Sequence, residues 1–230
     1  MEFNAEYRGV LRMRSQEYGK SIMGSPLLFF PSLGKCRLLV VAAVHGEEPE
    51  STFLLSRSLR VFDENFRDVA FVLCANPDGV TLGTRGNARG VDLNRNFPTK
   101  NWNAAPVTSR SVLEAPRDTL LSPGESPASE PETKALVELI QKLEPESILS
   151  IHAPIGCIDA TRESELVRNL ERVFGLPWIR DIGYETPGSL GTWCNERDIE
   201  CVTLELPRMA LELLFDRFGV PLADFLSHMK

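Results

Sequence analysis

Cysteine, histidine and long hydrophobic runs are all scarce in this sequence. The five cysteines form no C-x-x-C pair and several lie in apolar segments, so we expect reduced core residues rather than a disulfide framework. No segment approaches the roughly 18 apolar residues of a membrane span. Residues 1–20 lack the basic start and apolar core of a signal peptide. These absences favour a cytoplasmic protein that does not associate with membranes.

An excess of positive charge is also missing. The 230 residues contain 25 Lys and Arg against 32 Asp and Glu, which gives a formal net charge of -7. General nucleic-acid binding needs a basic surface that contacts phosphates, so nucleic acid is not an expected partner. A local arginine cluster could still bind a small anion. The chain is 43% hydrophobic and long enough for one sizeable core, and we expect a single domain over residues 1–230.

Strand-like and helix-like patterns alternate along the chain. Nearly continuous apolar runs at residues 37–44 and 69–74 predict buried parallel strands, and helical periodicity over residues 49–62 predicts the helix between them. Further strands are predicted at residues 8–13, 27–30, 147–151 and 201–206, and further helices after Ser129, over residues 163–174 and in the C-terminal region. We therefore expect an α/β fold with a central mixed, mostly parallel sheet and helices on both faces.

Three local signals refine this expectation. Asn76-Pro77-Asp78-Gly79 has the composition of a tight turn. Ser129 and Glu132 have the spacing of a capping box at the start of a helix. Residues 83–131 show neither strand nor helix periodicity, and a connection of that length in a compact protein usually has a function.

Two of the three histidines stand where strands are predicted to end. His45 follows the apolar run at residues 37–44 and is three residues before Glu48, and His152 follows the strand at residues 147–151. Two histidines and one glutamate are a common ligand set for catalytic zinc, which leaves a fourth position for a water whose pKa the metal lowers. A histidine at a strand end is often only a hydrogen-bonded structural residue, so both interpretations stay open at this point.

Other polar residues fit a hydrolytic site. Glu205 lies in an otherwise apolar strand, where burial should raise its pKa and suit it to proton transfer. Thr203 should share the face of Glu205 and could line a specificity pocket. Asn94 and Arg95 stand side by side, and a guanidinium offers two parallel donors to a carboxylate. A solvent-exposed basic loop is the alternative for these two residues.

Taken in order, these motifs resemble the M14 family of zinc carboxypeptidases. The matching segments run from residue 45 to residue 206 and are His45-x-x-Glu48, Asn76-Pro77-Asp78-Gly79, Gly90-Val91-Asp92-Leu93-Asn94-Arg95-Asn96-Phe97, His152, the segment from Tyr184 to Trp193, and Leu204-Glu205-Leu206. The resemblance implies the fold of that family and one Zn²⁺ per chain. It also implies zinc ligation by His45, Glu48 and His152.

The resemblance further implies roles for the remaining site residues. Glu205 matches the general base that activates water and passes the proton to the leaving amine. Arg85 is similar to the arginine that polarises the scissile carbonyl and stabilises the oxyanion. Asn94 and Arg95 match the pair that holds the terminal carboxylate of the substrate, and Tyr184 matches the tyrosine that closes over it.

Within that family the chain most resembles the bacterial murein peptide amidase A group. The signs are the extended block around Arg85 and Arg95, Ser122-Pro123-Gly124-Glu125, and His152-Ala153-Pro154. The resemblance implies cleavage of the γ-D-glutamyl–meso-diaminopimelate bond of murein tripeptide, a small peptide, in cytoplasmic cell-wall recycling. Asp159 or Arg162 could contact the far end of diaminopimelate.

Three alternatives remain open. The chain could be another M14-type carboxypeptidase, or an amidohydrolase of the aspartoacylase or succinylglutamate desuccinylase type, which shares the fold and a His-x-x-Glu site. It could also be a peptide-binding module without activity, although no candidate catalytic position is degenerate. The sequence does not distinguish a monomer from a homodimer.

Overall fold

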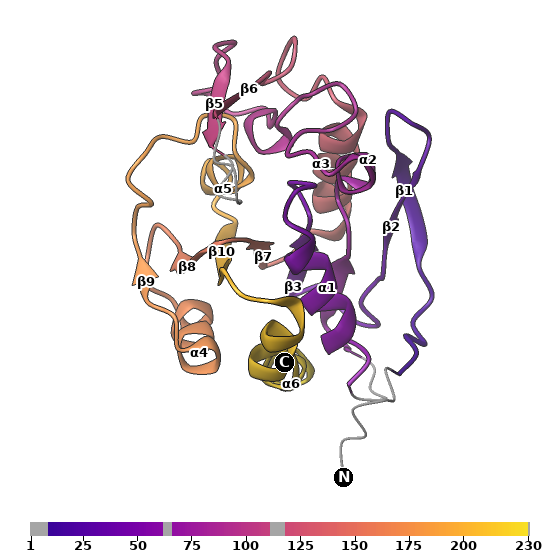
Figure 1. Cartoon of the computed structure of the whole chain (residues 1–230). Coiled ribbons are helices and arrows are strands. Elements are labelled where there is room, and N and C mark those ends of the chain that lie inside the picture. The colour runs from indigo at the N-terminus through magenta and orange to yellow at the C-terminus, as the bar shows by residue number, and fades with distance from the viewer. Residues whose placement is uncertain (1–8, 62–65, 111–117, 230) are drawn as a thin grey trace.

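The centre of the fold is a six-stranded sheet. The computed structural model describes residues 9–61, 66–110 and 118–229. The strands follow the order β4-β3-β7-β10-β8-β9 (Figure 1). Every neighbouring pair is parallel except β10 and β8, which are antiparallel. The strands are β3 (Leu38–Ala42), β4 (Val69–Val72), β7 (Ser147–His152), β8 (Ile155–Asp159), β9 (Trp178–Ile179) and β10 (Glu200–Pro207).

Helices pack on both faces of this sheet because its central strands are apolar on both faces. Side chains alternate along β3: Leu38, Val40 and Ala42 enter one hydrophobic cluster, and Leu39 and Val41 enter another. The first cluster includes α1 (Pro49–Ser58), α4 (Glu165–Phe174) and α6 (Leu211–Ser227), and the second includes α3 (Pro131–Leu143) and α5 (Leu190–Asn195). The predicted α/β fold, with a mixed and mostly parallel sheet, is confirmed.

The N-terminal prediction is partly wrong. No strand forms at residues 9–13, and the first hairpin instead pairs β1 (Gln16–Lys20) with β2 (Pro26–Phe29). The sequence of β1 is largely polar and its residues are partly or fully exposed, so it carries no apolar periodicity. Its position is fixed by pairing with β2, whose Leu27 and Phe29 are buried.

Two local structures predicted from the sequence also differ from those observed, the turn at residues 76–79 and the capping box at Ser129. Asn76 does not begin a simple turn: its side-chain oxygen accepts a hydrogen bond of 2.9 Å from the Gly79 amide and caps helix α2 (Pro77–Leu82). The predicted capping box does not form, because Ser129 donates to the Glu130 carboxylate and α3 begins at Pro131. Glu132 instead accepts a hydrogen bond from the Ile22 amide in the turn of the first hairpin.

The segment predicted to be irregular contains two short elements. A 3-10 turn spans Leu93–Arg95, and a hairpin pairs β5 (Val107–Arg110) with β6 (Asp118–Leu121). The buried Asn96 side chain fixes the segment, because its amide donates to the carbonyls of Pro123 at 2.8 Å and Ser126 at 3.1 Å. The segment therefore forms a wall beside the carboxyl end of the sheet.

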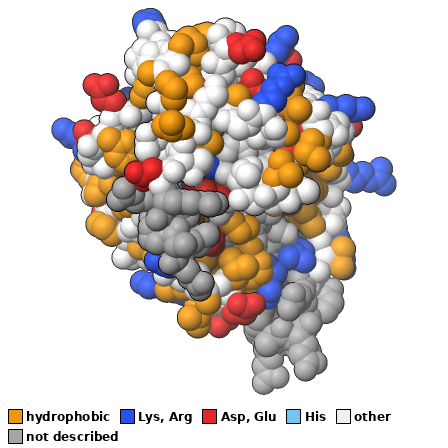
Figure 2. Space-filling view, turned by 45° about the horizontal axis from the view of Figure 1, so that its top comes forward, with side chains coloured by type: hydrophobic (Ala, Val, Ile, Leu, Met, Phe, Trp, Pro, Cys, Tyr) orange, Lys and Arg blue, Asp and Glu red, His pale blue; other side chains and the backbone are white. Residues whose placement is uncertain are grey.

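The surface carries charges of both signs, as expected from the composition of the chain. In Figure 2 the hydrophobic side chains of one face lie in small groups separated by polar ones, and charged side chains of both signs are spread around its edge. None of the helices in the described ranges has the length and hydrophobicity needed to cross a membrane. All five cysteines are free, as predicted.

Candidate active site

The predicted histidines meet at the carboxyl ends of neighbouring strands. β3 and β7 are parallel neighbours, so His45, shortly after β3, and His152, the last residue of β7, lie at the same edge of the sheet. The turn that carries His45 is tightly packed. Gly46 lies against the backbone of Gly79 in α2, and a Cβ atom at Gly46 would collide with it. The loop from His45 to Glu48 is thus held against α2.

Three metal-type donors converge at this edge. His45 Nδ1 lies 2.7 Å from one Glu48 carboxylate oxygen, and His152 Nδ1 lies 2.9 Å from the other. The two Nδ1 atoms are 3.2 Å apart. All three side chains are buried, whereas the adjacent Glu47 is exposed, so the fold selects Glu48 of the two carboxylates. Two imidazole nitrogens and one carboxylate within 4.8 Å of one another fit a zinc ion with an open fourth position.

The charges around these donors favour a cation. Burial raises the pKa of Glu48, but His45 and His152 outweigh it and hold that pKa well below its usual range. Burial and Arg85 lower the pKa of His45, while Glu48 and Asp92 raise it, with a net rise to about 8. Both shifts arise because negative carboxylates are held against the imidazoles.

Asp92 also belongs to this group of side chains. It is part of the motif at residues 90–97, but the sequence alone did not indicate a role for it. It is fully buried, and its two carboxylate oxygens contact different site residues. One lies 3.2 Å from His45 Nε2, and the other accepts a 3.0 Å hydrogen bond from Arg85 Nε. Asp92 therefore orients His45 and Arg85 together. The available signal was an acidic residue between the apolar Val91 and Leu93.

The two arginines differ in their partners. Arg85 lies beside the donor triad, with Nη1 3.4 Å from Glu48, and Asp92 and Glu48 raise its pKa against the effect of burial. Arg95 is buried and makes no ion pair within the described parts of the chain. Burial is the main cause that lowers its pKa. Its Nη1 donates to the Asn94 carbonyl at 2.8 Å, and the Asn94 side-chain oxygen accepts from the Leu190 amide at 2.9 Å.

Glu205 faces His152 across the β10–β7 pairing. Its side chain is only 9% exposed, and its Oε2 atom has no hydrogen-bond partner among the residues described. Burial is the main cause that raises its pKa. A buried carboxylate with a free oxygen beside the donor triad is suited to accept a proton.

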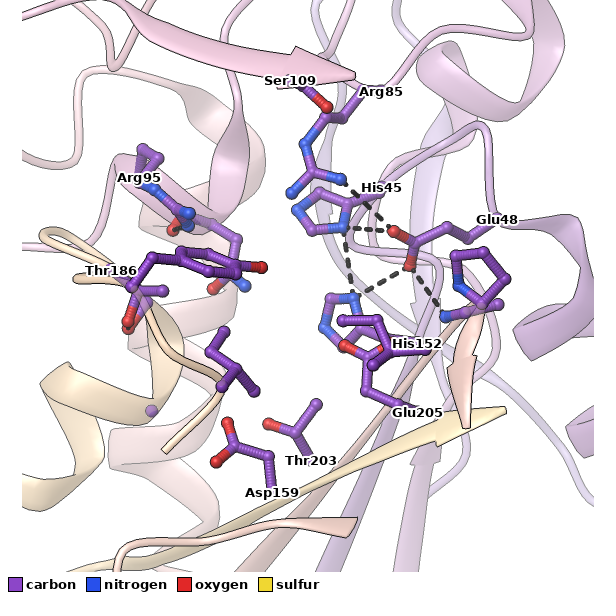
Figure 3. A pocket seen from close by; sticks show the side chains of 18 of the residues that line it. His45, Glu48, Arg85, Arg95, Ser109, His152, Asp159, Thr186, Thr203 and Glu205 are labelled. Atoms are coloured by element: carbon purple, nitrogen blue, oxygen red, sulfur yellow. Dashed lines mark hydrogen bonds and ion pairs between the residues drawn. The ribbon is translucent and has the colours of Figure 1, made fainter. Parts of the chain in front are cut away.

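One cavity of about 1500 Å³ brings the predicted site residues together. Figure 3 shows the donor triad on one side, Arg95 opposite, Arg85 at one end, and Asp159 and Thr203 at the other. Tyr184 also lines it and is 55% exposed. All nine site residues predicted from the sequence line this cavity: His45, Glu48, Arg85, Asn94, Arg95, His152, Tyr184, Thr203 and Glu205. Arg162 lies outside this lining, in a separate small depression.

Comparisons with known proteins agree with this geometry. The family model described as zinc carboxypeptidase matches residues 32–155. Murein peptide amidase A of Escherichia coli (strain K12) is 41% identical over 223 residues, which cover 95% of this chain and 92% of that protein. Murein peptide amidase A of Vibrio campbellii is 40% identical over 224 residues, with 96% and 90% covered.

Solved structures extend the comparison. The crystal structure of a murein-tripeptide amidase from Escherichia coli O157 matches with a TM-score of 0.93 and 38% identity, and covers 99% of this chain and 98% of that one. Bovine thrombin-activatable fibrinolysis inhibitor matches with a TM-score of 0.69 and 21% identity, covers 94% and 90%, and shares the fold. This chain belongs to the M14 family of zinc carboxypeptidases.

Proposed function

We propose that this protein is a zinc-dependent hydrolase that cleaves the γ-D-glutamyl–meso-diaminopimelate amide bond of murein tripeptide. We further propose that residues 1–230 form one catalytic domain and that it acts in the cytoplasm, in the recycling of cell-wall peptides. One observation carries the proposal. A single cavity contains three zinc-type donors, a buried carboxylate and a buried arginine; among the residues described, one oxygen of that carboxylate has no hydrogen-bond partner and the arginine makes no ion pair. The relatives named murein peptide amidase A support the choice of substrate.

His45, Glu48 and His152 would hold the zinc ion. When bound, zinc supplies Lewis acidity, which lowers the pKa of water and polarises a carbonyl. Asp92 would keep the His45 ring in the orientation that directs Nδ1 at the metal, because it occupies Nε2 on the far side of the ring.

Arg95 and Asn94 would bind the free carboxylate of the diaminopimelate residue next to the cleaved bond. The Arg95 guanidinium is buried at the cavity wall and has no anionic partner in the described ranges, and a bidentate carboxylate would supply one. Arg85 is held by Asp92 through Nε, so its remaining donors can stabilise charge that develops on the scissile carbonyl oxygen.

Glu205 would act as the general base and then as the acid. It would take a proton from the attacking water and deliver it to the amine of diaminopimelate as the carbon–nitrogen bond breaks. Thr203, two residues earlier on β10, would line the wall that the side chain of the substrate contacts. Tyr184, half-exposed at the cavity mouth, would close over the bound peptide.

The size of the cavity favours a peptide substrate over the N-acyl amino acids of an aspartoacylase-type enzyme. About 1500 Å³ exceeds the roughly 300–1,000 Å³ of ordinary small-molecule sites and accommodates a short peptide. An N-acyl amino acid, the substrate of an aspartoacylase-type enzyme, would leave much of that space unfilled. Val107, Thr108 and Ser109 of strand β5 also line the cavity.

The direct test uses purified, zinc-loaded protein and L-Ala–γ-D-Glu–meso-diaminopimelate. We expect release of free diaminopimelate that a chelator abolishes and added zinc restores. A panel of N-acyl amino acids and of peptides with ordinary α-linked C-terminal residues should react much more slowly. Faster hydrolysis of the N-acyl amino acids would favour the aspartoacylase-type function, and bound zinc with no hydrolysis of any substrate would favour a binding module.

A further inference from the structure

One carboxylate in the cavity has no partner among the residues that the structure describes. Asp159, at the end of β8, stands opposite Thr203 of β10 in the antiparallel register, and both line the cavity. Figure 3 shows the two side chains next to each other, at the end away from Arg85. The Asp159 carboxylate is half-buried and makes neither an ion pair nor a hydrogen bond within the described ranges. A carboxylate withdrawn from water usually has a cationic or hydrogen-bonding partner.

The surroundings of Asp159 are negative. Burial, Glu205 and Asp181 raise the pKa of Asp159 to about 6, against a smaller lowering by His152. The other two arginines that line the cavity, Arg180 and Arg208, are exposed. Arg180 lies over the Trp178 ring, 5.9 Å from its centroid. An ammonium group at this end would relieve the repulsion among these carboxylates.

The layout of the cavity indicates which group of the substrate lies near Asp159. An amino-acid residue at the cleaved bond carries three groups on its α-carbon: the amide nitrogen, the carboxylate and the side chain. The donor triad and Glu205 lie on one side of the cavity, Arg95 lies opposite, and Asp159 with Thr203 lies at the end between them. With the amide nitrogen near Glu205 and the carboxylate at Arg95, the side chain points towards Asp159.

We propose that Asp159, assisted by the Thr203 hydroxyl, binds an ammonium group on the side chain of the residue that leaves as the free amine. This inference rests on the proposed function, and it deepens that function by making the enzyme selective for diamino acids at this position. It also decides between the two residues that the sequence offered, because Arg162 lies outside the cavity lining. Asp159 is here a specificity-determining residue.

The test compares three peptides that differ by single groups. They are L-Ala–γ-D-Glu linked to meso-diaminopimelate, to L-lysine, which keeps the ammonium but lacks the far carboxylate, and to L-2-aminopimelate, which keeps the carboxylate but lacks the ammonium. The variant is Asp159→Asn, with Asp181→Asn as the matched control, because Asp181 is an exposed carboxylate lining the same cavity. Asp159→Ser serves as a second variant if the first does not fold.

We expect Asp159→Asn to lower kcat/KM for the diaminopimelate and lysine peptides by roughly 10- to 100-fold, the usual effect of losing a hydrogen bond to a charged group. The 2-aminopimelate peptide, already slow with the unaltered enzyme, should change by less than about 3-fold, and so should all three peptides with Asp181→Asn. An equal loss for all three peptides would mean a general structural role. An unchanged diaminopimelate rate, or loss for the 2-aminopimelate peptide only, would also overturn the assignment.

A binding measurement separates this inference from the proposed function. Calorimetric titration of the zinc-loaded protein with free meso-diaminopimelate and free L-2-aminopimelate needs no hydrolysis. Tighter binding of diaminopimelate, lost in Asp159→Asn, supports the ammonium site even if the murein tripeptide is not cleaved. Equal binding of the two compounds refutes the site even if the tripeptide is cleaved.

Discussion

Replacing Asp92 by asparagine should weaken zinc binding and slow catalysis together. Two side-chain donors face the two oxygens of Asp92, His45 Nε2 at 3.2 Å and Arg85 Nε at 3.0 Å, and the Asn94 amide also donates to one of these oxygens at 2.9 Å. When His45 Nδ1 is a metal ligand, Nε2 carries the ring proton, so both partners donate. Asparagine has only one oxygen, and its NH₂ group would then face either the imidazole N–H or the guanidinium N–H. The substitution also removes a buried negative charge beside Arg85.

The magnitude follows from these two losses. Partners that orient a metal ligand typically change metal affinity or activity by about 10- to 100-fold when they are replaced. The same replacement takes away the carboxylate to which Arg85 Nε donates at 3.0 Å. Glu48, at 3.4 Å, then becomes the carboxylate nearest to Arg85. We therefore expect zinc affinity to fall by about 10- to 100-fold, and kcat at saturating zinc to fall by about 10-fold or more.

Asp78→Asn is the matched control. Asp78 is also buried, and its two oxygens also accept from two donors, Ser21 Oγ at 2.7 Å and the Met23 amide at 2.8 Å, but it does not line the cavity. Competition with a chromophoric chelator measures zinc affinity, and urea unfolding measures stability. Both variants should lose stability, and only Asp92→Asn should lose zinc. Equal zinc affinities in the two variants would refute the orienting role of Asp92.

Three further predictions concern the rest of the cavity. Glu205→Gln should lower kcat by about 10²- to 10⁴-fold with unchanged zinc content, measured by product release and metal analysis, and substantial remaining turnover would contradict its role as base. A chelator should lower the thermal midpoint of the unaltered protein but not that of His152→Ala, because only a metal bound to the folded state stabilises it. The pKa of Asp159 is raised in the folded protein, so this group binds more protons when folded. The stabilisation that protonated Asp159 contributes is therefore full below about pH 4 and is lost as the pH rises to about 6. Urea unfolding should show this decrease in the free energy of unfolding across that pH range, and Asp159→Asn should abolish this part of the pH dependence.

The proximity of His45, Glu48 and His152 could be predicted from the sequence for a physical reason. Parallel neighbouring strands end at one edge of a sheet, so residues that follow apolar runs about a hundred positions apart are brought together without any knowledge of the loops. His45 and His152 needed only the prediction of their strands, and Glu205 needed only the alternation within β10. The same alternation put Thr203 in the cavity wall.

The residues of the long segment after α2 could not be placed in this way. The position of Asp92 depends on a loop that buried side-chain amides hold: Asn87 bonds to Glu130 at 2.8 Å and Asn96 to three partners between residues 123 and 129. Such contacts join residues 27 to 43 positions apart and leave no periodic trace in the sequence. The β5–β6 hairpin also has no periodic signal in the sequence, because its strands are only four residues long and β6 is mostly exposed.

The distribution of charge in the cavity connects the metal to the choice of substrate. Around the donor triad lie the buried carboxylates of Glu48, Asp92 and Glu205 and the guanidinium of Arg85, and a divalent cation would offset the negative charge that is in excess among them. With that charge offset, and within the described part of the chain, Arg95 is left as a cation without an ion-pair partner and Asp159 as an anion without one. A substrate residue with a carboxylate on its α-carbon and an ammonium on its side chain satisfies both at once. A residue with a neutral side chain would leave Asp159 uncompensated, so the same charges that favour zinc binding also favour a diamino acid.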